Sequence, residues 1–146
     1  MANRSLTRRE FSRTSMVAFL SALGSASANK SAAQTDSLSR RSVIRQRLPG
    51  NPERQITLVE VVFPPGAGSP PHVHANGVMG FVVSGSITSK VGDEPERVFH
   101  AGEAWWEPPG AVHRVSRNVS SSENARLLAI YIAPPNASES DLMKQL

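Results

Sequence analysis

The chain has 146 residues and a net charge of +4, and its 39% apolar and 19% charged side chains suit one folded domain rather than a disordered chain. Residues 1–33 hold five of the 16 basic and one of the 12 acidic side chains, so residues 34–146 carry 11 of each and are neutral. A neutral domain lacks the basic surface that nucleic acids require, and the absence of cysteine excludes disulfides and thiolate metal sites.

The first 33 residues have the features of an export signal. The basic segment TRREFSR (Thr7–Arg13) precedes the apolar run TSMVAFLSALG and the small-residue segments SASA and SAA, where a signal peptidase would cut. The adjacent Arg8 and Arg9, followed by Phe11, resemble the bacterial twin-arginine motif, which implies export of the folded protein to the periplasm. The apolar run is too short and too rich in serine and glycine to remain as a membrane anchor. An ordinary secretory signal, or a short amphipathic helix without a targeting role, is the alternative.

Short runs rich in valine and isoleucine, separated by glycine and proline turns, dominate the rest of the chain. After a linker rich in serine and alanine at residues 34–40, such runs follow at about ten-residue spacing through residues 41–135. This spacing predicts an all-β domain of about seven or eight strands, either a sandwich or a barrel. Residues 136–146 are expected to form a tail with a helical turn or a frayed end.

Two histidines, His72 and His74, stand one residue apart just before an apolar run. On a strand, residues i and i+2 project from the same face, so the two imidazoles point together. Imidazole nitrogens in a core need partners, and a shared metal ion would supply one. His113 follows the turn PPGA, from which a barrel can return it beside the first pair. Three neutral imidazoles are a common ligand set for a divalent ion. The alternative is a cavity without a metal, in which the histidines hydrogen-bond to a ligand or to one another.

The spacing of these residues resembles the two motifs of the cupin superfamily. The first motif matches Gly66, His72, His74 and Gly85, and the second matches Gly102, Pro108, Gly110 and His113, with Asn118 one position later than the usual asparagine. The resemblance implies a double-stranded β-helix (jelly-roll) barrel with a metal bound by the motif histidines, and the glycines placed in turns. Small cupins are often homodimers in which an N-terminal strand pairs across the interface, and SVIRQRL is the candidate strand here.

One position departs from the family pattern. Val78 occupies the place where the first cupin motif usually supplies a glutamate ligand, and no carboxylate occurs between Glu60 and Asp93. We therefore expect three histidine ligands, which would leave the full 2+ charge on the ion and favour an anionic bidentate substrate such as a catecholate, enolate or diketonate. Fe(II) is the favoured metal because a protein folded before export could load it in the cytoplasm; Mn, Ni, Zn and Cu are the alternatives.

Apolar residues of neighbouring strands are expected to border the metal. Val78 and Val82 share one face of their strand, and Trp105 or Trp106 must face the cavity because adjacent strand residues alternate. Val78, Val82 and Trp105 are the candidate substrate-pocket residues; for the two tryptophans the alternative is core packing by one and a subunit contact by the other. His100 is expected at a surface or a strand end, and Glu107 is expected to be a solvated carboxylate, with a supporting role beside a ligand as the alternative.

These features leave two classes of function open. The first is an exported metal-dependent enzyme resembling cupin dioxygenases, which would act on a small enolisable or aromatic substrate. The second is a non-catalytic module that binds a small ligand or a metal. A lyase or hydrolase that uses metal-bound water is a third possibility, since three histidines also suit zinc.

Overall fold

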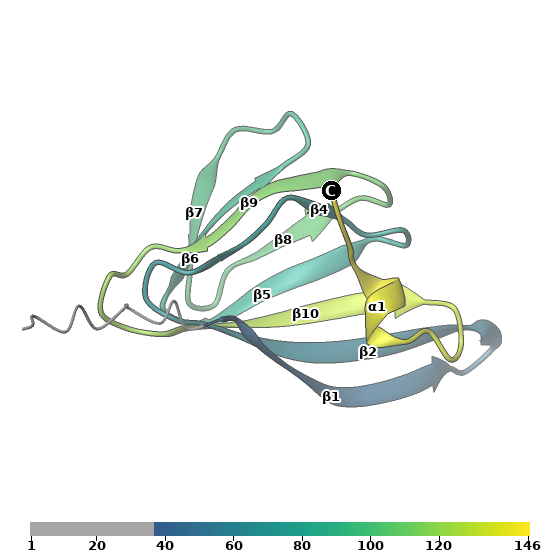
Figure 1. Cartoon of the computed structure of the whole chain (residues 1–146). Helices are drawn as coiled ribbons and strands as arrows, with labels where there is room; N and C mark the ends of the chain where they lie inside the picture. The colour runs from purple at the N-terminus through teal and green to yellow at the C-terminus, as the bar shows by residue number, and fades with distance from the viewer. Residues whose placement is uncertain (1–36) are drawn as a thin grey trace, which may run out of the picture. The chain divides into compact units, whose positions relative to one another are not determined.

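The apolar runs of the domain form two antiparallel β-sheets in a computed structural model that describes residues 37–146 (Figure 1). The predicted signal peptide, residues 1–33, and the first three residues of the linker lie outside the described residues. Among the described residues, no helix has the length and apolar character needed to cross a membrane.

The first sheet has five strands, and some of the strands that lie side by side in it are far apart in the sequence (Figure 1). In spatial order its strands are β1 (Ser39–Leu48), β2 (Asn51–Phe63), β10 (Ala125–Ala133), β5 (Val78–Ser84) and β8 (Ala104–Glu107). The central strands alternate strictly: along β5, residues 78, 80 and 82 are buried while 79 and 81 are exposed. Each strand therefore presents one apolar face to the interior, as the period of two requires.

The second sheet has six strands and covers the apolar face of the first (Figure 1). Its order is β11 (Lys144–Gln145), β4 (His72–Val73), β9 (Val112–Asn118), β6 (Ser86–Val91) and β7 (Arg97–His100), with β3 (Gly68–Ser69) also paired to β9. The core between the sheets is continuous, and its most deeply buried large apolar side chains are Phe63, Val78, Val82 and Ile87. The architecture confirms the predicted double-stranded β-helix.

The N-terminal strand β1 belongs to the sheet through pairing within the same chain. It begins at Ser39, two residues before the predicted start of the domain, and pairs antiparallel with β2. Glu60 of β2 ion-pairs with Arg41 of β1, at 2.6 Å, and with Arg126 of β10, which links three neighbouring strands across one face. No strand of residues 37–146 pairs with the other edge of β1, and its pairing across a dimer interface stays a prediction.

The C-terminal residues 136–146 are part of the fold rather than a frayed tail. They form the short helix α1 (Glu139–Leu142), as one predicted alternative had it, and then β11, which pairs with β4 (Figure 1). Leu142 is only 6% exposed and packs into the core. Leu142 and Ala137, both buried in the core, explain why the end of the chain docks on the barrel. Strand β4 carries His72, so this docking also supports the histidine cluster.

Asn118 fastens the end of β9 to two loops. The side chain is 2% exposed, and its amide nitrogen donates to the carbonyl oxygens of Phe63, Pro64 and Glu123 at 3.0, 3.1 and 2.7 Å. Its side-chain oxygen accepts a hydrogen bond from the backbone N–H of Ser120 at 2.9 Å. The asparagine thus satisfies buried backbone groups that no strand pairing reaches.

Replacing this asparagine should destabilise the barrel strongly. We expect Asn118→Ala to lower the free energy of unfolding by about 2 kcal/mol, because it leaves buried carbonyls without a donor. Asn118→Asp should cost at least as much, since it places an anion against three carbonyl oxygens. Urea denaturation measures both, with the exposed Asn124→Ala as the control, which should stay within about 0.5 kcal/mol of the native chain. A mild effect of Asn118→Asp would contradict the assigned hydrogen bonds.

Candidate metal centre

The three predicted histidines meet inside the barrel. His72 begins β4, His74 follows that strand, and His113 on β9 pairs directly with His72 across the sheet. All three are buried, with 4%, 4% and 2% exposure. The ring centroid of His72 lies 4.8 Å from that of His74 and 5.0 Å from that of His113.

A turn contact brings the two motif loops together. Gly110, in the turn before β9, adopts φ 76°, a left-handed conformation that favours glycine, and its N–H donates to the carbonyl of His74 at 2.8 Å. The other three motif glycines, Gly66, Gly85 and Gly102, also have positive φ, which confirms their predicted place in turns. The loop that delivers His113 is therefore tied to the loop that delivers His74.

Hydrogen bonds at the outer nitrogens orient the rings. The Nδ1 atom of His72 bonds to the carbonyl of Pro70 at 2.8 Å, and that of His74 bonds to the carbonyl of Leu142 at 2.6 Å. A carbonyl only accepts, so both Nδ1 atoms carry the proton and both Nε2 atoms keep a lone pair. His113 bonds through Nε2 to the hydroxyl of Ser89 at 2.8 Å, which leaves its Nδ1 facing the cluster. This is the arrangement of outer partners found around metal-binding histidines.

Glu107, at the end of β8, completes the cluster. It is 4% exposed, and its Oε2 lies 3.0 Å from His113 Nδ1 and 3.4 Å from His74 Nε2. Its Oε1 accepts a hydrogen bond from Trp105 Nε1 at 2.9 Å, but Oε2 has no hydrogen-bond partner among the described residues. One ligand atom from each of the three histidines and Glu107 lies within 4.8 Å of the others. The expected solvated carboxylate is therefore wrong, as is the expected absence of an acidic side chain from the cluster.

The strand register explains where the carboxylate comes from. Glu107 of β8 is the direct cross-strand partner of Val78 on β5, the position where the family motif usually supplies the glutamate. Directly paired residues have Cβ atoms about 5 Å apart on the same face of a sheet, so a carboxylate from either strand reaches the same point. The signal was present in the sequence: Glu107 stands two residues after Trp105 and so shares its inward face.

The electrostatics favour neutral imidazoles beside an ionised carboxylate. Burial lowers the pKa of His72 to about 4, and burial also lowers the pKa of His74. Burial raises the pKa of Glu107, but the His113 and His74 imidazoles lower it by more when they are protonated, so this pKa lies below its ordinary value. Neutral histidine and ionised carboxylate are the forms that bind metals.

The metal-free protein should lose stability as the pH falls. The pKa of His72 is 6.5 when unperturbed and about 4 in the fold, so between these values the unfolded chain binds the proton and the native chain does not. Stability is then complete above about pH 6.5 and declines toward pH 4, by about 3 kcal/mol from this residue. Urea denaturation at a series of pH values measures the slope, which His72→Asn should flatten. Equal slopes for the native chain and His72→Asn would contradict the assignment of this pH dependence to His72.

The remaining candidate residues occupy different places. The cavity at the histidines measures about 30 Å³, and Val78 lines it as predicted. Val82 is fully buried in the core and does not line the cavity at the histidines, while Trp105 lines a second, separate cavity. Trp106 is 46% exposed and faces outward, and His100 ends β7 at the surface, where its Nδ1 bonds to the hydroxyl of Ser86.

Two residues at this cavity carried no sequence signal. Arg40 of β1 lines it, and its guanidinium donates to the Ser69 hydroxyl at 3.2 Å. Tyr131 of β10 lies with its ring centroid 5.3 Å from that of His74, and burial raises its pKa to about 12. Both come from segments far from the histidine motifs in sequence, so only the sheet order brings them there.

Fold and site together define a double-stranded β-helix with a candidate metal centre between its sheets. The sequence matches the Cupin domain family over residues 59–131, and the chain belongs to that family. No curated protein sequence matches it significantly.

Several solved structures share the fold. The protein TT1209 from Thermus thermophilus is 28% identical, with a TM-score of 0.55 over 67% of this chain and 84% of that one. The DMSP lyase DddQ from Ruegeria pomeroyi is 18% identical, with a TM-score of 0.59 over 78% of this chain and 54% of that one. KdgF from Halomonas sp. is 20% identical, with a TM-score of 0.56 over 68% of this chain and 82% of that one.

Proposed function

We propose that this cupin is a metal-dependent enzyme that acts on a small anionic, enolisable or aromatic substrate, with dioxygenase chemistry at Fe(II) as the leading reaction. The observation that carries the proposal is the buried Glu107 Oε2, which has no hydrogen-bond partner among the described residues and faces imidazole nitrogens. A buried carboxylate oxygen beside nitrogen lone pairs is unfavourable on its own, and a cation among them removes the conflict.

The ligand atoms determine which metals the site suits and what chemistry a bound metal would supply. His72, His74, His113 and Glu107 would hold a divalent ion, which when bound supplies Lewis-acid activation and, if it is iron, electrons for a reaction with O₂. The carboxylate corrects the charge expected from three histidines, because it reduces the net charge of the site from 2+ to 1+. Nitrogen and carboxylate oxygen together suit Fe(II) and Mn(II) as well as Zn(II).

Arg40 supports an anionic substrate. It lies on the cavity wall that is formed by β1, and its guanidinium holds only a serine hydroxyl and a methionine sulfur among the described side chains. Guanidinium groups bind carboxylate and enolate oxygens in bidentate fashion. Because the cavity is about 30 Å³, only the coordinating end of a substrate fits inside, and the rest must lie beyond Arg40.

Metal analysis of protein purified from its native compartment, followed by a substrate screen, tests the proposal. We expect one equivalent of metal, and turnover of small enolates or catecholates that consumes O₂ when the metal is Fe(II). Arg40→Gln should raise KM about tenfold or more for anionic substrates and leave metal content unchanged. Arg54→Gln, an exposed arginine on β2, is the matched control. Loss of metal without loss of turnover would overturn the proposal.

A non-catalytic binding module is the second candidate, and the small cavity favours it. A space of about 30 Å³ holds an ion and little else. Under this alternative, metal raises the melting temperature but no substrate in the screen turns over. A lyase reaction would instead release product without O₂.

Export and dimerisation complete the proposal. We infer from Arg8, Arg9 and the following apolar run that the protein reaches the periplasm through the twin-arginine pathway. Replacement of both arginines by lysine should retain the protein in the cytoplasm. The outer edge of β1 pairs with no strand in the described part of the chain, which supports a homodimer, and Val43 and Ile44 are about half exposed along that strand. Light scattering gives the mass in solution, and a monomer would contradict this part.

A further inference from the structure

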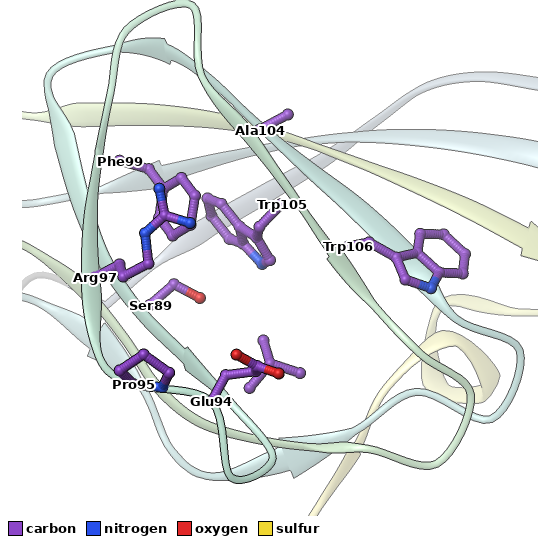
Figure 2. Close-up of a pocket in the computed structure, with 9 residues that line it drawn as sticks. Ser89, Glu94, Pro95, Arg97, Phe99, Ala104, Trp105 and Trp106 are labelled. Atoms are coloured by element: carbon purple, nitrogen blue, oxygen red, sulfur yellow. The ribbon is translucent and has the colours of Figure 1, made fainter.

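A second cavity, of about 240 Å³, lies where the edge strands of the two sheets approach each other (Figure 2). β7 ends the order of one sheet and β8 ends the order of the other, and both contribute walls. We call this cavity the seam pocket, and its characteristic residues are Ser89, Glu94, Arg97, Phe99, Trp105 and Trp106. None of its lining residues lines the cavity at the histidines, so the two are separate sites.

Aromatic rings form much of the wall of the seam pocket. Phe99 and Trp105 are 7% and 8% exposed, with ring centroids 4.9 Å apart, and they close its inner end. Trp106 borders the same pocket, but its side chain is 46% exposed and points away from Phe99 and Trp105 (Figure 2). Flat aromatic walls favour a flat aromatic ligand, which stacks on them edge-to-face or offset.

Arg97 supplies a positive charge beside these rings. Its guanidinium carbon lies 4.9 Å from the centroid of the Phe99 ring (Figure 2). Among the described residues it makes no hydrogen bond and no ion pair, so its donors are available to a ligand oxygen. Glu94 is on the other side of Ser89 in the same view, and the two opposite charges form no ion pair.

We propose that the seam pocket binds a small aromatic carboxylate, with its ring against Phe99 and Trp105 and its carboxylate on Arg97. The guanidinium matches a carboxylate in charge and geometry. The volume suits a single-ring acid, because drug-sized ligands occupy larger pockets of roughly 300–1,000 Å³.

The walls of the seam pocket also contact the histidine cluster. Trp105 donates to Glu107 Oε1 at 2.9 Å, and the Ser89 hydroxyl bonds to His113 Nε2 at 2.8 Å. A ligand in the seam pocket therefore touches side chains that hold two of the four cluster residues. The binding itself does not depend on the proposed function, since the pocket exists without a metal.

Tryptophan fluorescence tests the proposal directly, because the ring of Trp105 forms part of the wall of the seam pocket. Phenylacetate is titrated into protein stripped of metal with a chelator, so that coordination to a metal cannot give the signal. We expect a saturable change with phenylacetate and at least tenfold weaker binding of the neutral 2-phenylacetamide. Tighter binding of phenethylamine than of phenylacetate would assign the pocket to Glu94 and overturn the proposal, as would the absence of any saturable change.

Variants at the two arginines provide the matched test. Arg97→Gln should weaken phenylacetate binding at least tenfold, whereas Arg54→Gln, which removes the same charge from an exposed site on β2, should not change it. Equal affinity of phenylacetate for both variants would overturn the assignment to Arg97. The outcome is independent of metal content and turnover, so failure here and failure of the proposed enzyme are distinguishable.

Discussion

Glu107→Gln should weaken metal binding by more than about 100-fold, because it removes the one anionic ligand of the cluster. The same change should leave the metal-free protein equally stable or more stable. The amide keeps an oxygen that accepts from Trp105 Nε1, and it removes a buried charge whose Oε2 has no hydrogen-bond partner among the described residues. Competition with a chelator measures the affinity, and thermal unfolding with and without metal measures the two stabilities.

The prediction is specific because metal affinity should fall while the stability of the metal-free protein should stay the same or rise. A carboxylate that served only to hold the histidines in place would lower the stability of the metal-free protein when removed. Glu96→Gln, at an exposed position in the turn before β7, removes the same charge and should change neither quantity. Metal affinity within threefold of the native value for Glu107→Gln would exclude the carboxylate as a ligand.

The fold was largely predictable because its signals are local. Period-two alternation along segments such as β5 and β10, and turn glycines such as Gly85, fix strands and reversals over a few residues. The C-terminal segment was not predictable in the same way. Its docking depends on two buried apolar residues, Ala137 and Leu142, and on pairing between β11 and β4, which are about 70 positions apart in the chain.

The histidine cluster was predictable, whereas its acidic member was predictable only in part: alternation places Glu107 on the inward face of β8, but only the strand register places it at the histidines. His72 and His74 are two residues apart, and a motif turn precedes His113, so a linear pattern captures them. Glu107 enters the cluster because β8 pairs with β5 so that it faces Val78. Cross-strand register depends on the whole sheet, and a search for the acid along β5 finds none. Arg40 could not be predicted from the sequence for the same reason, since β1 reaches the cavity only through its place in the fold.

Moving the carboxylate across the strand pair should restore the site. Glu107→Val alone should abolish metal binding, with a loss above about 100-fold, and should destabilise the protein by about 1–3 kcal/mol because Trp105 Nε1 loses its acceptor. Adding Val78→Glu should return the affinity to within about tenfold of the native value, since the two Cβ atoms are direct cross-strand neighbours on the inward face. The lost stability should not return, because the indole stays without its partner.

The neighbouring strand position supplies the control. Met79 pairs with Trp106 one step along the same two strands, and both side chains face outward, with 43% and 46% exposure. Met79→Glu combined with Glu107→Val therefore carries the same composition of charge on the wrong face, and it should bind no metal. Isothermal titration calorimetry with one metal across the set gives the comparison. If Val78→Glu and Met79→Glu both restored metal binding, net charge rather than a fourth ligand at the cluster would determine binding. If only Val78→Glu restores it, either strand can place a carboxylate at the same point of the cluster.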